Sequence, residues 1–395
     1  MLAFMTLSLM ALTLLWLVPT LVFLLEVVAG CSASREPQTS FAQSQGRIAV
    51  LIPAHNESTG LQPTLDDIKP QLGSTNRLVV VADNCSDDTA SVATERGAEV
   101  AIRNDLTRIG KGYALDWGIK YLAADPPDIV IVIDADCRVA GGTIAHLAGA
   151  CEQRQGPVQS LNLMTAPVGS AINHQVAEFA WRVKNWVRPL GLKALGLPCQ
   201  LMGTGMAIPW NLVRTANLSS GLIVEDLKLG LELASAGHYP QFCPEAVVTS
   251  TFPNSSEGAT AQRQRWEQGQ IGLIFHEALP LMLVAIKRRD IRLLVLVLDL
   301  LVPPLSLFVL ILGATIVVNL FASLIDPSWK AVLISASCLG AVILAIILAW
   351  ANYGRDILPT KSLGQVPLYL ANKCRTYVGA LLGRRISLWT RADRS

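Results

Sequence analysis

Three long apolar segments constrain the fold of this 395-residue chain more than any other feature. Residues 1–28 contain one acidic residue, Glu26, and neither Lys nor Arg. Asp299 is the only charged residue in 293–325, and 331–351 contains none. Because about 20 apolar residues in a helix span the hydrocarbon core of a bilayer, each segment predicts a membrane-spanning helix.

The segments between and after these helices differ in composition, and residues 47–285 have the mixture typical of a soluble domain. The expected order is a transmembrane helix over 1–30, a globular domain over 47–270, an interfacial helix over 271–290, transmembrane helices over 293–325 and 331–351, and a basic amphipathic tail over 353–395.

Lys and Arg gather on one side of the predicted helices. They precede the second helix and follow the third: Lys287, Arg288, Arg289, Arg292, Arg355, Lys361, Lys373, Arg375, Arg384, Arg385, Arg391 and Arg394. Since positive charge stays on the cytoplasmic side, we expect a multi-pass protein of the inner (plasma) membrane with a cytoplasmic domain and tail and an outer N-terminus. Val28–Cys31 also resembles a lipoprotein cleavage site, but no basic region precedes it and the apolar run is long for a signal peptide.

Composition excludes several classes of protein. Only 16% of the residues are charged, against about 25% in soluble domains, and the net charge is +2. A soluble cytosolic enzyme, a disordered protein and a nucleic-acid binder are therefore disfavoured. The eight cysteines form no C-x-x-C pair, so neither a zinc framework nor a disulfide pattern is indicated.

Two further stretches mix Trp and Leu with basic residues, 177–199 and 363–389. This mixture is typical of helices that lie on a membrane surface, although packed soluble helices remain the alternative. Asp299 lies seven residues after Arg292, so we expect it near the cytoplasmic headgroups. Pro303 and Pro304 should kink the second membrane helix.

The globular domain alternates strand and helix signals. Strands are predicted over 47–53, 77–82, 98–102 and 128–133, with helices over 61–71 and 88–96. Continuous apolar strands between helices indicate an α/β fold with a mainly parallel sheet, which binds ligands beyond the carboxyl ends of its strands. The polar clusters His55–Glu57, Asp83–Asn84 and Asp134–Asp136 all fall at such ends.

Asp134 and Asp136 carry the sharpest chemical signal. Alternation along a strand points both carboxylates the same way, and two negative charges this close favour a cation such as Mg²⁺ or Mn²⁺, which bridges to phosphate oxygens. A solvated strand end is the structural alternative for this pair. Farther on, Glu225–Asp226 precede a helical pattern, and Gln262–Trp266 add cations and an aromatic surface. A helix N-terminus and a membrane-surface belt are the structural alternatives for these two groups.

Taken together, the order of short motifs resembles the family 2 inverting glycosyltransferases. The motifs are Pro53-Ala54-His55-Asn56-Glu57, Asp83, Lys111-Gly112-Tyr113-Ala114-Leu115, Asp134-Ala135-Asp136, Gly203-Thr204-Gly205, Glu225-Asp226 and Gln262-x-x-Arg265-Trp266. They are similar to the membrane-bound branch that contains exopolysaccharide transferases, ceramide glucosyltransferase and cellulose and hyaluronan synthases. The resemblance implies a GT-A fold, a Rossmann-like mainly parallel sheet, over about residues 47–270.

The resemblance also implies roles for individual residues. Glu57 and Asp83 would contact uridine, and Lys111 would hold the nucleotide. Asp134 would bind the nucleotide side of the donor and, with Asp136, the metal, Mg²⁺ or Mn²⁺. Asp226 would be the general base. The remaining substrate-binding residues are Ala54, Ala135, Gly203, Thr204, Gly205, Glu225, Gln262, Arg265 and Trp266.

These motifs predict a metal-dependent hexosyltransferase that moves a sugar from a UDP-sugar to a membrane-associated acceptor. A lipid-linked oligosaccharide or a glycolipid is expected as the acceptor, in bacterial exopolysaccharide or glycolipid synthesis, with other polysaccharide-assembly proteins as partners and no nucleic acid. A processive polysaccharide synthase is the alternative, although three helices are few to enclose a polar channel. A non-catalytic membrane scaffold with a degenerate transferase domain is a further alternative.

Overall fold

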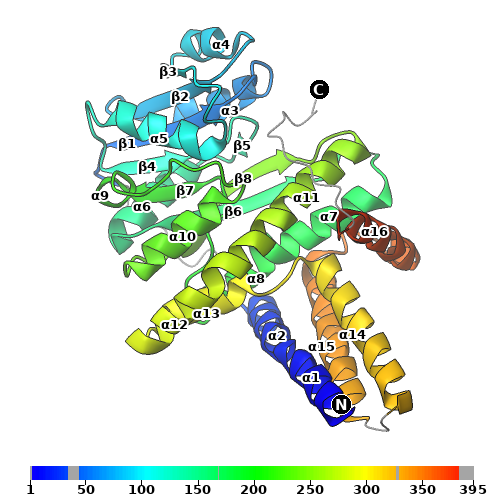
Figure 1. Cartoon of the computed structure of the whole chain (residues 1–395). Helices are drawn as coiled ribbons and strands as arrows, with labels where there is room; N and C mark the ends of the chain where they lie inside the picture. Colours follow the sequence, from blue (N-terminus) through cyan, green and yellow to red (C-terminus); the bar gives the residue numbers. More distant parts are fainter. Residues whose placement is uncertain (1, 34–43, 168, 326–328, 382–395) are drawn as a thin grey trace.

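The computed structural model describes residues 2–33, 44–167, 169–325 and 329–381 (Figure 1). Two apolar helices, α1 (Leu2–Leu15) and α2 (Leu17–Ser32), come first in the chain. A mixed αβ domain follows, and the chain returns to long apolar helices after it. The domain and the apolar helices occupy opposite ends of the molecule in Figure 1.

The centre of the domain is one mixed sheet of eight strands in the order β3-β2-β1-β4-β7-β6-β8-β5. The strands are β1 (Ile48–Ala54), β2 (Arg77–Asp83), β3 (Glu99–Arg103), β4 (Ile129–Val132), β5 (Arg138–Val139), β6 (Val158–Thr165), β7 (Met206–Pro209) and β8 (Gln241–Thr251). Strands β3, β2, β1 and β4 run parallel, whereas β7 is antiparallel to both β4 and β6. The predicted α/β class and the mainly parallel strands of the first half are confirmed.

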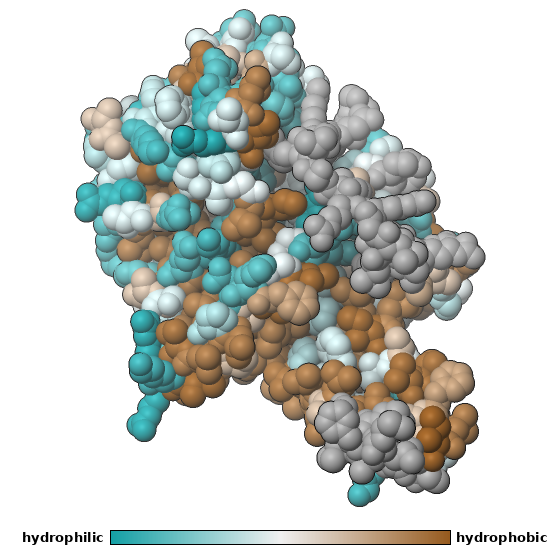
Figure 2. All heavy atoms as spheres, viewed as in Figure 1, coloured by the Kyte–Doolittle hydropathy of each residue, from teal (hydrophilic) through white to brown (hydrophobic). Residues whose placement is uncertain are grey.

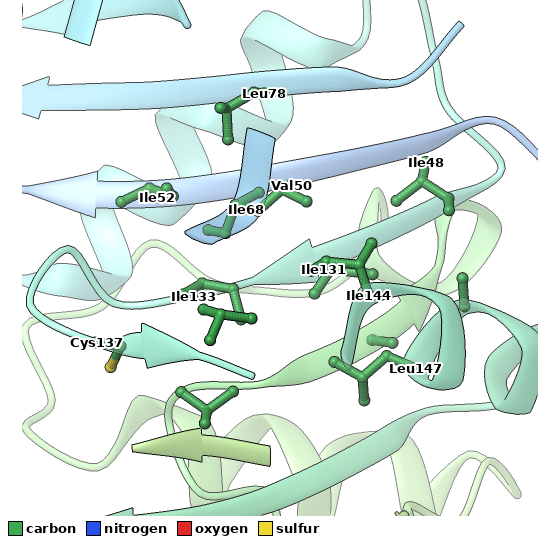
Figure 3. Close-up of a cluster of buried hydrophobic side chains, with 14 of the residues drawn as sticks. Ile48, Val50, Ile52, Ile68, Leu78, Ile131, Ile133, Cys137, Ile144 and Leu147 are labelled. Atoms are coloured by element: carbon green, nitrogen blue, oxygen red, sulfur yellow. The ribbon is translucent and has the colours of Figure 1, made fainter. Parts of the chain in front are cut away.

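Helices cover both faces of this sheet, which explains why its first strands are apolar throughout. On one face lie α3 (Leu61–Ile68), α4 (Thr89–Glu95) and α6 (Thr143–Arg154). On the other lie α5 (Lys111–Leu122), α9 (Trp210–Val213) and α10 (Glu225–Ser235). Figure 3 shows the first cluster, where Ile52 and Ile131 from the strands meet Ile68 and Ile144 from the helices.

The segment predicted to lie on the membrane surface, 177–199, is instead largely packed inside the molecule. It forms α7 (Ile172–Arg182), a π-helical turn (Val183–Val187) and α8 (Arg188–Ala194). Here α8 contacts α2 so closely that a Cβ on Gly191 would lie 2.0 Å from the backbone oxygen of Glu26. Leu190 and Leu192 are buried in the cluster that contains Phe23 of α2, whereas Trp181 packs on Trp266 and Trp186 on Tyr353.

The predicted single helix over 293–325 is two helices. The first, α13 (Ile291–Leu300), ends before Pro303 and Pro304, and α14 (Leu305–Ile325) begins after them. The prolines lack the N–H groups that a continuous helix needs. Gln270 donates from Nε2 to the carbonyl oxygens of Leu300 (3.4 Å) and Val302 (3.1 Å), so it satisfies part of the exposed end of α13.

The helix predicted over 271–290 is part of a longer helical segment. This segment comprises α11 (Ser256–Leu273), a π-helical turn (Ile274–Ala278) and α12 (Leu279–Arg288). Asp290 caps the next helix, α13, by accepting from the backbone N–H of Leu293 at 3.0 Å. Figure 1 shows α11 and α12 running across the base of the domain.

Four helical stretches of the described chain are long and apolar enough to cross a membrane: Leu9–Ser32, Gly258–Arg288, Leu305–Ile325 and Lys330–Tyr353. The last is α15, which contacts both α2 and α14. Within this bundle the amide of Asn319 donates to the hydroxyl of Thr13 at 3.0 Å and to that of Ser335 at 3.3 Å. Such hydrogen bonds hold apolar helices together where hydrophobic burial cannot.

The predicted tail begins with a 3₁₀ turn (Thr360–Gln365) and α16 (Val366–Leu381). On α16, Lys373 is buried and forms an ion pair with Glu267 of α11 at 3.2 Å. This part of the tail is therefore docked on the domain. The basic residues from 382 onward lie outside the described residues.

Candidate active site

A cavity of about 510 Å³ lies where β1 and β4 end, and it brings together residues from the whole length of the domain. Among the described residues its wall includes most of the predicted site: Glu57, Lys111, Asp134, Ala135, Asp136, Gly203, Thr204, Glu225, Asp226, Gln262, Arg265 and Trp266. Ala54, Asp83 and Gly205 lie outside this wall.

Lys111, the first residue of α5, is the electrostatic centre of the site. Its ammonium lies 2.5 Å from Asp134 Oδ1 and 3.8 Å from Glu225 Oε1, and it donates to the carbonyl oxygen of Gly203 at 2.7 Å. Burial opposes the charged form, but the carboxylates of Asp134 and Glu225 outweigh it and raise the pKa of Lys111. Lys111 therefore stays positive in the cavity and can meet a phosphate.

Asp226, like Lys111, lies close to Gly203. A Cβ built on Gly203 would lie 3.5 Å from Lys111 Nζ and 3.3 Å from Asp226 Oδ2. The carboxylates at the end of β4 and at the start of α10 are thus joined by a short series of contacts, although 92 residues of chain separate Lys111 from Gly203.

Burial has a clear effect on the two acids that begin α10. It raises the pKa of Glu225 and, against the charge of Lys111, also that of Asp226. A carboxylate whose pKa is raised toward neutrality is a better proton acceptor when it ionises. The side chain of Asp226 is only half-buried and faces the cavity, which suits it to contact with a substrate.

Hydrogen bonds from α3 hold the loop that contains Asp136. The hydroxyl of Thr64 lies 2.7 Å from the carbonyl oxygen of Ala135 and 2.6 Å from that of Cys137. A Cβ on Gly60 would lie 2.9 Å from Glu57 Oε2 and 3.6 Å from Asp136 Cβ. Glu57 and Asp136 therefore come together from the ends of β1 and β4.

Asp134 and Asp136 fit a metal ion that is also held by a phosphate-bearing ligand. Within the described ranges no three His, Cys, Asp or Glu side chains converge into a complete metal site, and Asp134 is engaged by Lys111. Mg²⁺ and similar ions are commonly held by one or two carboxylates together with substrate phosphates. The donor set of Asp134 and Asp136 thus fits an ion shared with a diphosphate.

The Gly203–Gly205 loop is shaped by two left-handed residues. Gly203 has φ +86° and Gly205 has φ +66°, a region that side-chain-bearing residues avoid. A Cβ on Gly205 would lie 1.7 Å from Ser160 Oγ. Between them, Thr204 Oγ1 accepts from the backbone N–H of Asp134 at 3.0 Å, so this loop orients the end of β4.

Gln262, Arg265 and Trp266 enter the cavity from α11. Gln262 is buried, and Trp266 packs on Trp181 of α7 with ring centroids 4.9 Å apart. Trp181 in turn donates from Nε1 to the carbonyl oxygen of Asn162 at 3.1 Å. Two aromatic rings therefore line the same cavity as the carboxylates.

Asp83 lies at the end of β2 but is fully buried. Arg103 donates from Nη1 to Asp83 Oδ1 at 2.5 Å, while the buried Oδ2 has no hydrogen-bond partner among the described residues. Burial raises the pKa of Asp83, opposed by Arg103. Ala54 is also buried, at the end of β1. The predicted contact of these residues with a nucleotide stays a prediction.

The predicted site did not include the polar residues that β6, the π-helical turn and α8 contribute to the same cavity: Asn162, Lys184, Asn185 and Arg188. Lys184 and Asn185 lie within the π-helical turn, a feature often found at functional sites. The alternation of basic and apolar residues in 177–199 was the available signal, and it was assigned to lipid contact.

The ion pair of Asp299 was also missed. It is buried, and it accepts from Nη2 of Arg188 at 2.5 Å, while Glu26 accepts from Nε of Arg188 at 2.6 Å. Asp299 is therefore paired inside the protein, and its depth relative to the membrane headgroups stays a prediction. Helices from three distant segments meet at this buried cation.

Comparisons with known proteins agree with this geometry. The family model described as "Glycosyltransferase like family 2" matches residues 45–269, more than half of the chain. The probable glycosyltransferase YdaM of Bacillus subtilis is 26% identical over 238 residues, covering 56% of this chain and 55% of that protein. Glucosyl-3-phosphoglycerate synthase of Mycobacterium tuberculosis is 38% identical over 102 residues, or 24% of this chain and 31% of that protein.

Among solved structures, the mannosyltransferase PcManGT of Pyrobaculum calidifontis, in complex with GDP-Man and Mn²⁺, aligns with a TM-score of 0.47 and 15% identity over 86% of this chain and 99% of that one. The chain belongs to the family 2 glycosyltransferases, and its domain has their GT-A fold. Its match spans about half the length of YdaM.

Proposed function

We propose that this protein transfers a sugar from a UDP-sugar to a membrane-associated acceptor, a lipid-linked oligosaccharide or glycolipid of bacterial exopolysaccharide or glycolipid synthesis. The observation that carries the proposal is that Asp134, Asp136, Asp226 and Lys111 line one cavity, with the apolar helix α13 in its wall. This arrangement offers a diphosphate site, a base and access from a membrane.

The donor diphosphate would lie at the end of β4. Asp134 and Asp136 would hold Mg²⁺ or Mn²⁺ jointly with it, and this ion would stabilise the negative charge of the leaving diphosphate. Lys111 and Arg265 would add positive charge on the same phosphates. Glu57, in the wall of the cavity, would meet the nucleoside.

Asp226 would act on the acceptor. A sugar hydroxyl is a poor nucleophile at neutral pH, so a carboxylate within hydrogen-bond reach must take its proton as the new bond forms. The hydroxyl oxygen would attack the anomeric carbon opposite the departing diphosphate, and this single displacement would invert the anomeric configuration. Trp266 and Gln262 would position the acceptor sugar.

The surface of the molecule supports a membrane location. Figure 2 shows apolar side chains gathered over α12, α13 and the helices below the domain. Leu279, Leu283 and Ile286 of α12 are each 60% exposed, and Ile291 of α13 is 69% exposed. Their burial in lipid would hold the base of the domain on the bilayer. The distribution of Lys and Arg favours a cytoplasmic domain.

The test is to incubate membranes containing the full chain with a panel of nucleotide sugars and Mn²⁺ and to measure the mass of extracted lipids. We expect one lipid class to gain the mass of one sugar from a UDP-sugar. No sugar-dependent product from any donor would overturn the proposal. A ladder of added sugars would support processive synthesis instead.

Asp226→Asn membranes provide the negative control, and Asp125→Asn membranes provide a matched one. Asp125 lies before β4, at the end of the strands opposite the cavity, where it pairs with Arg47. Its substitution changes the same functional group without touching the cavity, so it should leave the product unchanged.

A further inference from the structure

A second, smaller cavity adjoins the active site on the side of the apolar helices. Its volume is about 100 Å³, and it lies among α7, α11, α14 and α16. The two cavities share the wall residues Trp181, Lys184, Arg188, Trp266 and Gln270. The two cavities are therefore adjacent, and one elongated molecule could place one end in each of them.

One side of this second cavity is apolar and comes from segments of the predicted membrane region. Its residues are Phe23, Val302, Pro303, Pro304 and Leu305, with Tyr369 of α16. Residues 302–304 form the break between α13 and α14. This wall suits a hydrocarbon chain that arrives from the bundle rather than from water.

The other side is positively charged. It carries Lys184, Arg188, Arg263 and Lys373, with Glu267 as its carboxylate. Arg188 is neutralised by Glu26 and Asp299, and Lys373 by Glu267. Lys184 and Arg263 are the two cations of this wall without an ion pair among the described residues, and three carboxylates against four cations leave one surplus positive charge.

Lys184 and Arg263 form no ion pair within the described part of the chain, although the charges of Asp226, Asp299 and Glu267 favour the charged form of Lys184. The ammonium of Lys184 lies 6.0 Å from the centroid of the Trp181 ring and forms no hydrogen bond or ion pair there. Arg263 makes only long hydrogen bonds, to the Asn173 carbonyl oxygen (3.3 Å) and Thr260 (3.4 Å), and its buried Nε has no partner. Partly desolvated cations without an ion pair are costly unless an anion binds.

We propose that this second cavity binds the phosphate group of a lipid-linked acceptor, with Lys184 and Arg263 as its ligands. The hydrocarbon chain would leave past Val302 and Leu305 toward the membrane helices. The acceptor sugar would extend past Trp181 and Trp266 to Asp226. This inference rests on the proposed function and narrows its acceptor from glycolipids in general to phosphate-bearing lipids.

The test is equilibrium binding to the detergent-purified full chain carrying Asp226→Asn, so that no turnover interferes. The probes are a short-chain isoprenyl phosphate, the corresponding isoprenyl alcohol and inorganic phosphate. We expect the isoprenyl phosphate to bind at least about tenfold more tightly than either other probe, because a hydrogen bond to a charged group contributes on the order of tenfold or more in affinity.

Adding Arg263→Met should remove that preference while leaving the binding of UDP with Mn²⁺ intact, because Arg263 lines the second cavity and not the first. Arg214→Met is the matched control, because Arg214 is exposed at the end of α9. Equal binding of isoprenyl phosphate and alcohol, or an unchanged preference in Arg263→Met, would overturn the proposal. Inorganic phosphate binding as tightly as the lipid phosphate would overturn the lipid part.

The two proposals fail in different experiments. If the protein does not transfer sugar, the membrane assay with the donor panel yields no product, whatever the binding results. If the acceptor lipid carries no phosphate, the product forms but the binding preference is absent.

Discussion

Two cations, each held between two carboxylates, organise the two halves of the cavity. Lys111 lies between Asp134 and Glu225 at the end of β4, and we call this part of the cavity the donor half. Arg188 lies between Glu26 and Asp299 beside the apolar helices, and we call that part the membrane half. The partners of Lys111 come from the segment after β4 and from the start of α10, within the αβ domain, whereas those of Arg188 come from α2 and α13.

The difference between these clusters indicates different roles. Lys111 and Asp134 face the cavity, where a diphosphate and its metal ion can exchange partners with them. Glu26 lies outside both cavity walls and is almost completely buried. The first cluster is therefore arranged for chemistry, and the second fixes the apolar helices to the catalytic domain.

Asp226→Asn should have the largest effect, because it removes the proposed general base. Loss of a general base costs about 10²–10⁴-fold in rate, so kcat should fall by that factor while the protein stays folded. The measurement is sugar transfer in membranes beside Asp125→Asn. Turnover in Asp226→Asn equal to that of the wild type would place the base elsewhere.

Arg188→Met should affect the membrane half through stability. It leaves Glu26 and Asp299 buried without a counter-charge, which costs about 3–5 kcal/mol in the free energy of unfolding. Thermal unfolding of the detergent-solubilised protein measures this loss. The triple variant Glu26→Gln/Arg188→Met/Asp299→Asn should recover most of it, and a triple variant as unstable as the single one would show that charge compensation is not the reason.

Gly205→Ala tests the support beneath the donor half. The left-handed φ of +66° and the clash with Ser160 together should cost about 2–4 kcal/mol in stability. Gly141→Ala is the control, because a Cβ there meets nothing within 4 Å. Equal thermal stability of the two variants would mean that the loop adapts to a side chain.

Trp181→Phe should have the smallest effect on activity. Trp181 lies in the wall shared by the two cavities. The substitution removes the hydrogen bond to Asn162 and weakens the contact with Trp266, which should cost about 1 kcal/mol. We expect the KM for the acceptor to rise more than that for the donor. A rise confined to the donor KM would assign this aromatic pair to the nucleotide instead.

The sequence predicted the donor half better than the membrane half, for a physical reason. Asp134, Asp136 and Asp226 lie at strand and helix ends, and parallel strands bring such ends to one edge of a sheet. The strands over 47–53 and 77–82 were also placed to within a residue, because their apolar runs are short and have clear ends.

The membrane half depends on contacts between distant segments that have no local signature. Arg188 and Glu26 are 162 residues apart in the chain. A basic residue among Trp and Leu is compatible with a lipid surface or with a buried carboxylate, and only the packing of α2 on α8 decides between them. The break at Pro303 was anticipated as a kink, but the length of apolar sequence around it concealed two separate helices.

The central claim is that one cavity separates donor binding by Asp136 from proton transfer by Asp226, and equilibrium binding of UDP with Mn²⁺ tests it directly. Removing a metal ligand should weaken metal-dependent binding about tenfold or more. The account predicts this loss in Asp136→Asn and wild-type affinity in Asp226→Asn. Equal affinities in both variants, or a larger loss in Asp226→Asn, would contradict it.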